Sequence, residues 1–360
     1  MIVCFFGAWD PEYPRNRVLR AGLRRAGVTV TEARVAEHRA FRRWPALALA
    51  FARAGRDADV VFVPEFRHKD VPLARALAGR RRLVFDPLVS RWDTLVHDWG
   101  LHREGGLQAR WNRRLDRWSL GLADVVWCDT WAHGELYAAL GVPRARLRRV
   151  LVGCEDAFFA VGPPPPEDVV RITYLGGFLP LHGVSVMIEA AVLLERASGL
   201  PPWRMALVGR GITYEAAREH VARLGLERVD LPGATAYADS PRVLAESHVV
   251  LGAFGTSPKA GRVIPHKVYQ GLAAGRAVVT GDGAGVREVF TPGTHLELVT
   301  AGDARALAAT LERLLRDPGR RACLGAAGRR RALDVASPMK VGEQARLALM
   351  GEGERMPDRG

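Results

Sequence analysis

The sequence has few cysteines and no long apolar run, and each of these shortages excludes a class of protein. Its 360 residues include four cysteines, far apart and without a CxxC pair, so neither a disulfide framework nor a zinc site is indicated. No stretch approaches the ~20 apolar residues of a membrane span. The opening MIVCFFGAWD lacks the basic start of a signal peptide and is interpreted as a buried first strand. These shortages favour a cytoplasmic protein.

The chain is basic, with a formal net charge of +13, but most of the excess is arginine. Only four of its 52 basic residues are lysines, and a GC-rich coding bias explains part of this preference for arginine. Nucleic acid, an anionic membrane surface and a phosphorylated substrate are all compatible with this charge. Two of the four lysines, Lys259 and Lys267, fall in one short segment, which favours a function there.

Two familiar nucleotide-binding motifs are missing. Neither GxxxxGK[ST] nor a GxGxxG with an acidic residue ~20 positions on occurs, which argues against P-loop and simple dinucleotide enzymes. Three glycine turns follow predicted strands instead, at 176–177, 209–211 and 281–285. Backbone amides in such turns can face an anion without side-chain obstruction. The sequence therefore favours a nucleotide or phosphate site of another type.

Short apolar runs alternate with helical patterns along the whole chain, as in parallel sheets covered by helices on both faces. The predicted strands are 2–6, 28–30, 59–64, 82–86 and 123–129, then 171–175, 204–208, 229–231, 248–253 and 277–279. Between the two groups, four consecutive prolines cannot enter a helix or a central strand. We predict an N-terminal domain over 1–160, a second over 161–335, and a C-terminal helix within 336–360 that returns toward the first domain and ends in a disordered tail.

The segment 257–288 sets cationic side chains against a helix and a glycine turn. Lys259, Arg262, His266 and Lys267 fall within nine positions, and the helix ends at Gly275. The strand that follows ends at the edge where open α/β sheets bind ligands. The pattern predicts a site for a phosphorylated ligand, and a solvent-facing Lys/Arg cluster is the alternative.

Much of the chain resembles the retaining glycosyltransferases of family 4, in that family's order and spacing. The resemblance is carried by ITYLGGFLPLHGVSVMIEAA (172–191), MALVGRGITYEAAREHVARLGL (205–226), VDLPG (229–233), HKVYQGLAAGRAVVTGDGAGVREVF (266–290) and LVTAGDARALAATLERLLRDPGRRACLGAAGR (298–329). The stretches 86–100 and 123–142 are similar to the family's acceptor domain.

The resemblance implies an α/β protein of GT-B architecture, with two Rossmann-like domains whose parallel sheets face a central cleft. It also implies transfer of a sugar from a nucleotide-sugar donor, with retention of anomeric configuration and without a metal. The acceptor would be a glycan, lipid-linked or another precursor of cell-surface polysaccharide. No cofactor is expected, because the nucleotide-sugar is a substrate.

The chain departs from the family at four donor-site positions. The family has two acidic residues with seven positions between them, and the matching residues are Arg262 and Gln270. Its Arg and Lys for the diphosphate match Gly177 and His182. Gln270 can still bond ribose hydroxyls. We hypothesise that Lys259, Arg262 and Lys267 neutralise the diphosphate from the other side of the pocket.

The predicted site residues fall into three groups. The catalytic group is Asp86, which would orient the acceptor, with Arg262 and Lys267. The donor-binding group is Gly7, Gly176, Gly177, His182, Gly209, Arg210, Gly211, Leu231, Lys259, Tyr269 and Gln270. The acceptor-side group is Arg15, Asn16 and His97, and no metal ligands are expected.

Two stretches, 38–53 and 103–118, mix arginine with aromatic and apolar side chains. This mixture suits anionic lipid headgroups, and hence a peripheral position on the inner face of the cytoplasmic membrane. It also suits single-stranded nucleic acid, or core helices whose arginines reach solvent. Lacking a recognisable nucleic-acid module, we predict no nucleic-acid partner. A sugar-nucleotide epimerase on the same fold and a non-catalytic nucleotide-sugar-binding relative stay open beside the transferase.

Overall fold

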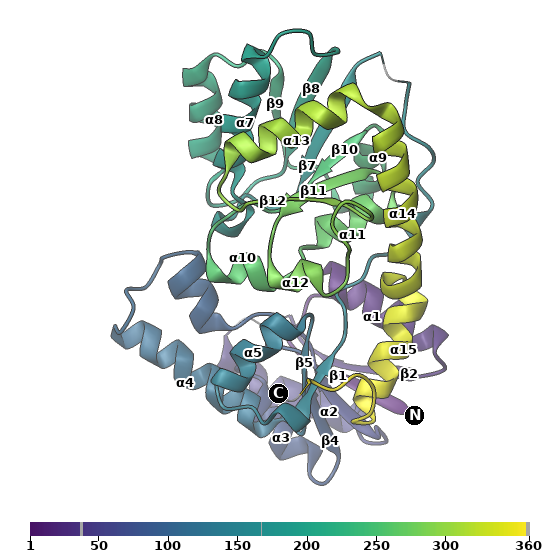
Figure 1. Ribbon diagram of the computed structural model, residues 1–360. Helices are drawn as coiled ribbons and strands as arrows, with labels where there is room; N and C mark the ends of the chain where they lie inside the picture. The colour runs from purple at the N-terminus through teal and green to yellow at the C-terminus, as the bar shows by residue number, and fades with distance from the viewer. Residues whose placement is uncertain (37–38, 167, 358–360) are drawn as a thin grey trace. The chain divides into compact units, whose positions relative to one another are not determined.

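The computed structural model describes residues 1–36, 39–166 and 168–357 (Figure 1). The chain divides into two compact units. Unit 1 comprises Met1–Gly153 and Pro338–Gly360, and unit 2 comprises Cys154–Ser337. Each unit is built around a six-stranded parallel sheet with helices packed against it, so the predicted two-domain α/β fold is confirmed.

The sheet of unit 1 has strands β1 (Ile2–Gly7), β2 (Thr29–Arg34), β3 (Val60–Val63), β4 (Arg82–Phe85), β5 (Val125–Cys128) and β6 (Leu147–Arg149). They lie in the order β2-β1-β3-β4-β5-β6, and every neighbouring pair is parallel. The chain order reverses between β1 and β3. Open α/β sheets bind ligands outside the carboxyl ends of the strands at such a reversal.

Alternate side chains of β1 face opposite layers of helices, as the period of a strand requires. Val3 and Phe5 belong to the apolar cluster that contains α1 (Pro14–Arg25). Cys4 and Phe6 belong to the cluster on the other face. The remaining helices of unit 1 are α2 (Ala40–Ala54), α3 (Val71–Ala78), η1 (Asp93–Asp98), α4 (Leu107–Leu122), α5 (Trp131–Ala139), η2 (Arg144–Arg146) and α15 (Pro338–Leu349).

The C-terminal helix α15 packs against α1 (Figure 1). The two helices come so close that a Cβ on Gly22 would lie 2.2 Å from the carbonyl oxygen of Pro338. The units meet in sequence at 153/154 and 337/338, whereas the predicted boundaries are 160/161 and 335/336. Residues 350–357 differ from the expected disordered tail, because Arg355 forms a β-bridge with Arg148 and Met356 is buried. The end of that tail, 358–360, lies outside the described residues.

The sheet of unit 2 has strands β7 (Val170–Leu175), β8 (Trp203–Val208), β9 (Val229–Gly233), β10 (Val249–Leu251), β11 (Ala277–Gly281) and β12 (Glu297–Val299). All neighbouring pairs are parallel in the order β12-β11-β10-β7-β8-β9. This is the dinucleotide-fold order, with the reversal between β7 and β10. The sequence pattern does not predict β6 or β12, because each is short and includes charged residues, so neither forms an apolar run.

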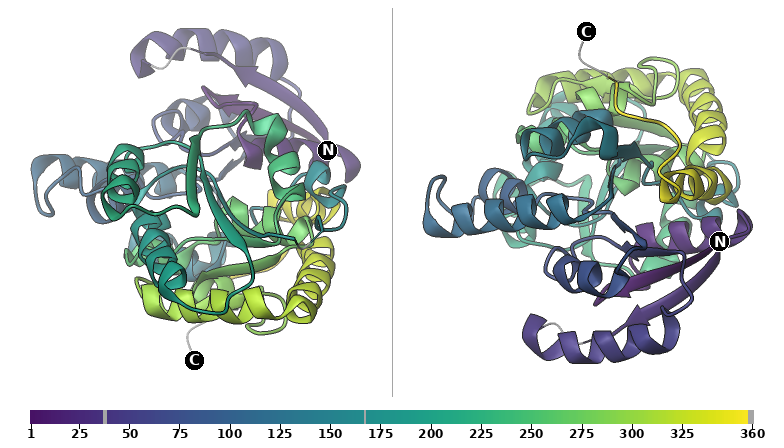
Figure 2. Two further views of the ribbon diagram at one scale, coloured as in Figure 1. Left: turned by 90° about the horizontal axis from the view of Figure 1, so that it is seen from above. Right: turned by 90° about the horizontal axis from the view of Figure 1, so that it is seen from below.

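Helices cover both faces of this second sheet, and α13 lies along α7 in all views (Figures 1 and 2). The helices of unit 2 are α6 (Asp156–Phe159), η3 (Pro180–His182), α7 (Val184–Arg196), α8 (Tyr214–Leu224), η4 (Tyr237–Asp239), α9 (Ser240–Ala245), α10 (Pro258–Arg262), α11 (His266–Ala273), α12 (Ala284–Arg287), α13 (Ala304–Arg316) and α14 (Pro318–Ala336). Within the described ranges, no helix combines the length and apolarity needed to cross a membrane.

Candidate functional site

The turns after β7 and β8 are bonded to each other at the carboxyl edge of unit 2. The amide of Gly176 donates to the carbonyl of Val208 at 3.0 Å, and that of Phe178 to the carbonyl of Arg210 at 2.9 Å. Gly209 has a φ of +146°, and a Cβ there would lie 1.8 Å from the carbonyl oxygen of Gly176. Only glycine permits this approach. The two turns therefore present bare backbone beside the reversal point of the sheet.

Lys267, near the start of α11, places its ammonium group against the first of these turns. A Cβ on Gly176 would lie 3.1 Å from its Nζ, so the glycine makes room for the lysine. Nζ also lies 4.8 Å from the centre of the Tyr174 ring. The side chain is 5% exposed, and burial lowers the pKa of Lys267 to about 7. No carboxylate of the described residues pairs with it, so a bound anion would favour its protonated form.

His182 is a buried structural group beside this turn. Its Nδ1 lies 2.9 Å from the Tyr174 hydroxyl and within hydrogen-bond distance of the Gly177 carbonyl. Burial lowers the pKa of His182 far below its usual value, and the charges of Lys267 and Lys259 lower it further. The ring is therefore neutral at physiological pH and fixes the turn, without supplying charge to a ligand.

The short helix α10 brings the other predicted cations to the same region. Ser257 caps it by accepting a hydrogen bond from the Ala260 amide at 3.3 Å. Lys259 is buried, and its positive charge contributes to the lowered pKa of His182. Arg262 ends the helix half-buried. The structure thus places Lys259 and Lys267 near the glycine turns. Their helices, α10 and α11, follow β10, whereas the turns follow β7 and β8.

Gln270, also on α11, belongs to a chain of polar groups that the sequence does not predict. Its Nε2 donates to the Tyr237 hydroxyl at 3.1 Å, and that hydroxyl donates to a carboxylate oxygen of Glu155. Gln270 is 6% exposed. Tyr237 and Glu155 are 33 and 115 positions away along the sequence, so no local spacing could reveal the arrangement. A carboxylate is therefore coupled to Gln270 through one hydroxyl.

The remaining donor-group residues lie in different surroundings. The exposed guanidinium of Arg210 stacks 4.8 Å from the Tyr214 ring, and the carbonyl of Leu231 accepts from the Tyr214 hydroxyl at 3.1 Å. Tyr269 is fully buried, with its ring 5.8 Å from that of Phe290. Gly7 is the last residue of β1 in unit 1, whereas the other donor-group residues belong to unit 2.

The carboxyl edge of unit 1 holds a buried ion pair. Nε of Arg15 donates to Oδ2 of Asp86 at 2.5 Å, and both side chains are at most 1% exposed. The other guanidinium nitrogens donate to the carbonyls of Leu151 and Val150 at 3.1 and 3.2 Å. Burial raises the pKa of Asp86, and the charge of Arg15 opposes that rise. Two predicted residues therefore meet, but each is the other's main partner.

Glu65 is a buried carboxyl group at this edge that the sequence reasoning missed. It follows β3, at the reversal point, and Asn16 donates to its Oε1 at 2.8 Å. Its Oε2 is buried without a hydrogen-bond partner among the described residues. Burial raises the pKa of Glu65 to about 8, although the Asn16 bond opposes the rise. The signal available in the sequence was a Glu directly after a strand-ending proline.

His97 lies apart from the pair formed by Arg15 and Asp86. It is on η1, half-buried, and its ring packs edge-on at 4.7 Å from Trp92. A buried His133 instead lies at the sheet edge, with Nδ1 2.7 Å from Asp129, which follows β5. Across the described ranges, no group of three or more His, Cys, Asp or Glu could hold a metal ion.

The two α/β units, each built on a six-stranded parallel sheet, have the GT-B architecture. Residues 2–153 match the family model described as "Glycosyl transferase 4-like domain". Residues 170–317 match the model described as "Glycosyl transferases group 1". Both matches are to glycosyltransferase domain families, and each spans less than half of the chain. A comparison with curated proteins gives no match.

Solved structures of low sequence identity share this fold. Sucrose-phosphate synthase of Thermosynechococcus elongatus superposes with a TM-score of 0.73 at 17% identity, covering 96% of this chain and 97% of that one. HepE of Anabaena in complex with UDP-glucose gives 0.70 at 16%, covering 97% and 99%. The apo form of the lipopolysaccharide outer core galactosyltransferase WaaB gives 0.66 at 14%, also covering 97% and 99%. At these identities the likeness concerns the fold.

Proposed function

We propose that this protein transfers a sugar from a nucleotide-sugar donor to an acceptor hydroxyl, with retention of anomeric configuration. Unit 2 binds the donor. The observation that carries the proposal is the buried Lys267 ammonium, which has no carboxylate partner among the described residues and lies against the glycine turn at Gly176. A buried cation without an anion is costly, and a bound diphosphate would offset that cost.

The diphosphate lies against the bare turns at Gly176 and Gly209, with Lys267 and Lys259 supplying charge. Arg262 contributes from the end of α10. This scheme replaces the Arg and Lys that the family has where Gly177 and His182 stand here. HepE, a structure of the same fold, is solved with UDP-glucose, which supports a donor of this chemical class.

Gln270 binds the ribose in place of the family's carboxylate. Its Nε2 is engaged by Tyr237, so its carbonyl oxygen is the group that would accept from a ribose hydroxyl. The Glu155 carboxylate polarises the Tyr237 hydroxyl, and through it the amide. Glu155, which lies outside the family motif, thus partly takes the place of the missing acidic residue.

In the proposed reaction, the bond between the anomeric carbon and the β-phosphate oxygen breaks as the bond to the acceptor oxygen forms on the same face of the sugar. The proton of the acceptor hydroxyl passes to the leaving phosphate oxygen. No cofactor or metal takes part in this scheme. Lys267 stabilises the charge that develops on the leaving diphosphate, which is the larger part of the catalytic effect expected of the protein.

The acceptor is bound by unit 1, at the carboxyl edge of the sheet that the buried pair of Arg15 and Asp86 holds in place. A lipid-linked glycan fits one further feature. Helix α4 projects from the rest of unit 1 (Figure 2). It exposes Leu107, Trp111 and Trp118, at 80%, 57% and 53%, among several arginines. Exposed aromatic and basic side chains on one helix suit an anionic membrane surface. In the stretch 38–53, by contrast, Leu47 and Phe51 are buried in the core, and His38 lies outside the described residues.

The test is calorimetric titration of Lys267→Met with UDP-, GDP- and dTDP-sugars. Removing one partner of a buried charge pair costs about 2–5 kcal/mol, so affinity should fall by about 30-fold or more. Lys340→Met, which removes an exposed lysine of unit 1, is the control and should bind as the wild type does. Because Lys267 has no protein carboxylate as partner, its loss should not lower the melting temperature. Unchanged donor affinity in Lys267→Met contradicts the proposal.

Turnover separates the transferase from its alternatives. The same donors are incubated with and without membrane lipids, and release of nucleoside diphosphate is followed. The transferase releases it only when an acceptor is present. Conversion of the donor sugar without an acceptor would identify an epimerase, and binding without any turnover would identify a non-catalytic relative.

A further inference from the structure

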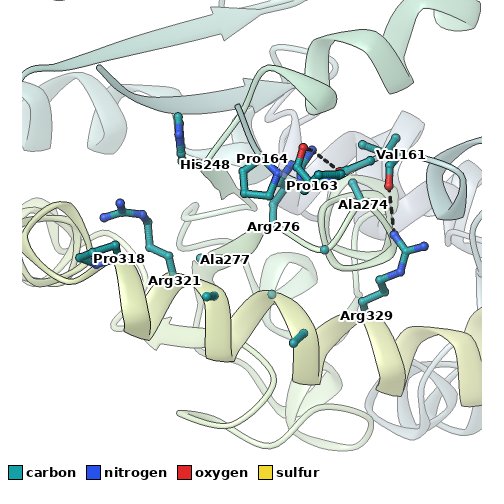
Figure 3. Close-up of a pocket in the computed structure, with 15 residues that line it drawn as sticks. Val161, Pro163, Pro164, His248, Ala274, Arg276, Ala277, Pro318, Arg321 and Arg329 are labelled. Carbon is teal, nitrogen blue, oxygen red and sulfur yellow. Dashed lines mark hydrogen bonds between the residues drawn. The ribbon is translucent and has the colours of Figure 1, made fainter. Parts of the chain in front are cut away.

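Unit 2 contains a pocket at the edge of the sheet opposite the glycine turns. Its volume is about 500 Å³. It lies at the amino ends of two strands, because His248 directly precedes β10 and Ala277 begins β11. The proline segment at 161–164 forms one wall and helix α14 the other (Figure 3). The proposed transferase reaction makes no use of this pocket.

The lining of this pocket is cationic. Three arginines and a histidine line it, and no Asp or Glu of the described residues does: the four are Arg276, Arg321, Arg329 and His248. Arg276 is 1% exposed. Burial, together with the charge of Arg329, lowers the pKa of Arg276 to about 10. Two guanidinium groups therefore repel each other in a site that offers them no carboxylate.

The hydrogen bonds of these arginines end on neutral carbonyl groups. Arg276 donates to the carbonyls of Leu244 and Gly162, both at 2.9 Å. Arg329 donates to the carbonyls of Val161 and Ala273 at 3.2 and 3.1 Å. Prolines supply carbonyls but no N–H, which explains why donors gather along this segment. Carbonyls satisfy these donors but leave the positive charges of Arg276 and Arg329 uncompensated.

One donor in the pocket is still available. Nη1 of Arg276 has no hydrogen-bond partner in the part of the chain that the structure describes, although its Nε and Nη2 are fully engaged. Figure 3 shows Arg276 between Pro163 and Pro164 and helix α14, with Arg329 toward one end of the pocket. The rest of the lining is Pro, Ala, Gly and Val, which can pack against an apolar or sugar-like body.

We propose that this pocket binds a small phosphorylated molecule, with its phosphate at Arg276 and Arg329 and its organic part against the proline segment and α14. Arginine is well suited to phosphate because its planar donors can bind two oxygens together. The volume is typical of sites for small organic ligands and exceeds what inorganic phosphate alone would fill. The site is separate from the donor site, and it would stand even if the transferase proposal failed.

The experiment uses the full chain carrying Lys267→Met, so that the donor site does not contribute. Glucose 6-phosphate and inorganic phosphate are titrated separately, followed by ³¹P NMR line broadening and by calorimetry. We expect both probes to bind, with glucose 6-phosphate at least about tenfold tighter because only it can contact the rest of the lining. No binding of either probe overturns the proposal, and equal binding overturns the part that concerns the organic body.

The variant Ala326→Glu tests whether the ligand binds in this pocket, and it keeps the arginines that would hold the phosphate. Ala326 is an exposed pocket residue of α14, and a carboxylate there would compete for the guanidinium groups. Leu333→Glu adds the same charge to the same helix outside the pocket, at a position that is 42% exposed. We expect at least a tenfold loss of glucose 6-phosphate affinity in the first variant and none in the second. Equal affinity in the two variants would place the ligand elsewhere and overturn the proposal.

Discussion

The two sheet edges of this protein handle charge in opposite ways. At the edge of unit 2, Lys267 is buried beside a glycine turn without a carboxylate partner among the described residues. At the edge of unit 1, the buried Arg15 is already paired with Asp86. The first arrangement leaves a positive charge for a ligand to neutralise, whereas the second neutralises itself. A binding charge and a structural charge can therefore be told apart by their partners, although both are buried cations at the same kind of edge.

The largest expected effect comes from breaking the buried ion pair of Arg15 and Asp86 in unit 1. Asp86→Asn leaves the buried guanidinium of Arg15 without a counter-charge, which should lower the free energy of unfolding by about 3–5 kcal/mol. Urea unfolding is followed by tryptophan fluorescence in a Trp203→Phe background, because Trp203 is the one tryptophan of unit 2. The signal then reports unit 1 alone.

The double variant Arg15→Met/Asp86→Leu sharpens this result. Replacing both members of a buried pair by apolar side chains removes the unpaired charge, so most of the lost stability should return. A single Asp86→Asn variant within about 1 kcal/mol of the wild type would mean that the pair does not hold the edge together.

Breaking the glycine turns of unit 2 should have the next largest effect. Gly209→Ala places a Cβ 1.8 Å from the Gly176 carbonyl oxygen at a φ of +146°, which should cost about 2–3 kcal/mol and displace the turn. Donor affinity should fall with it. The matched variant is Gly177→Ala, whose Cβ would meet nothing closer than 3.6 Å. Thermal unfolding and calorimetry should separate the two, and equal behaviour would contradict the need for close approach.

The raised pKa of Glu65 in unit 1 can be tested through the pH dependence of stability. Its pKa is about 8 in the folded protein against the ordinary 4.5, so the folded state holds the proton more tightly than the unfolded state. Stability should fall as pH rises from about 4.5 to 8, by at most about 1.4 kcal/mol per pH unit. Glu65→Gln keeps the oxygen that Asn16 bonds and should lack this component. Parallel curves for the two proteins would exclude a raised pKa.

The smallest effect should come from an ion pair nearer the surface of unit 1. Nη2 of Arg144 donates to both carboxylate oxygens of Glu135, at 2.5 and 2.6 Å, but the side chains are 22% and 39% exposed. Glu135→Gln should change the free energy of unfolding by about 0.2–1 kcal/mol, since solvent screens such pairs. Measured in the same Trp203→Phe background, it is the control for Asp86→Asn. A loss as large as that of Asp86→Asn would show that burial is not the deciding variable.

Much of the fold could be predicted from the sequence because it depends on local periodicity. Runs such as 59–64 and 171–175 correspond to β3 and β7 within one or two residues. The glycine turns were also predictable, since a Gly pair after an apolar run has few other uses. The strands β6 and β12 were missed because each is short and interrupted by charged residues. The division at Gly153 lies before the prolines that suggested it.

The sequence by itself determined the two α/β units, the positions of the glycine turns and the unusual residues at 262 and 270, because each depends on residue type and local spacing. Only the tertiary structure decided which charges are paired. Glu155 reaches Gln270 through Tyr237, and Asp86 is taken by Arg15, 71 positions away. Partners so distant in sequence are brought together by the strand order of each sheet, and it is this pairing that distinguishes a group free to bind a ligand from one that holds the fold.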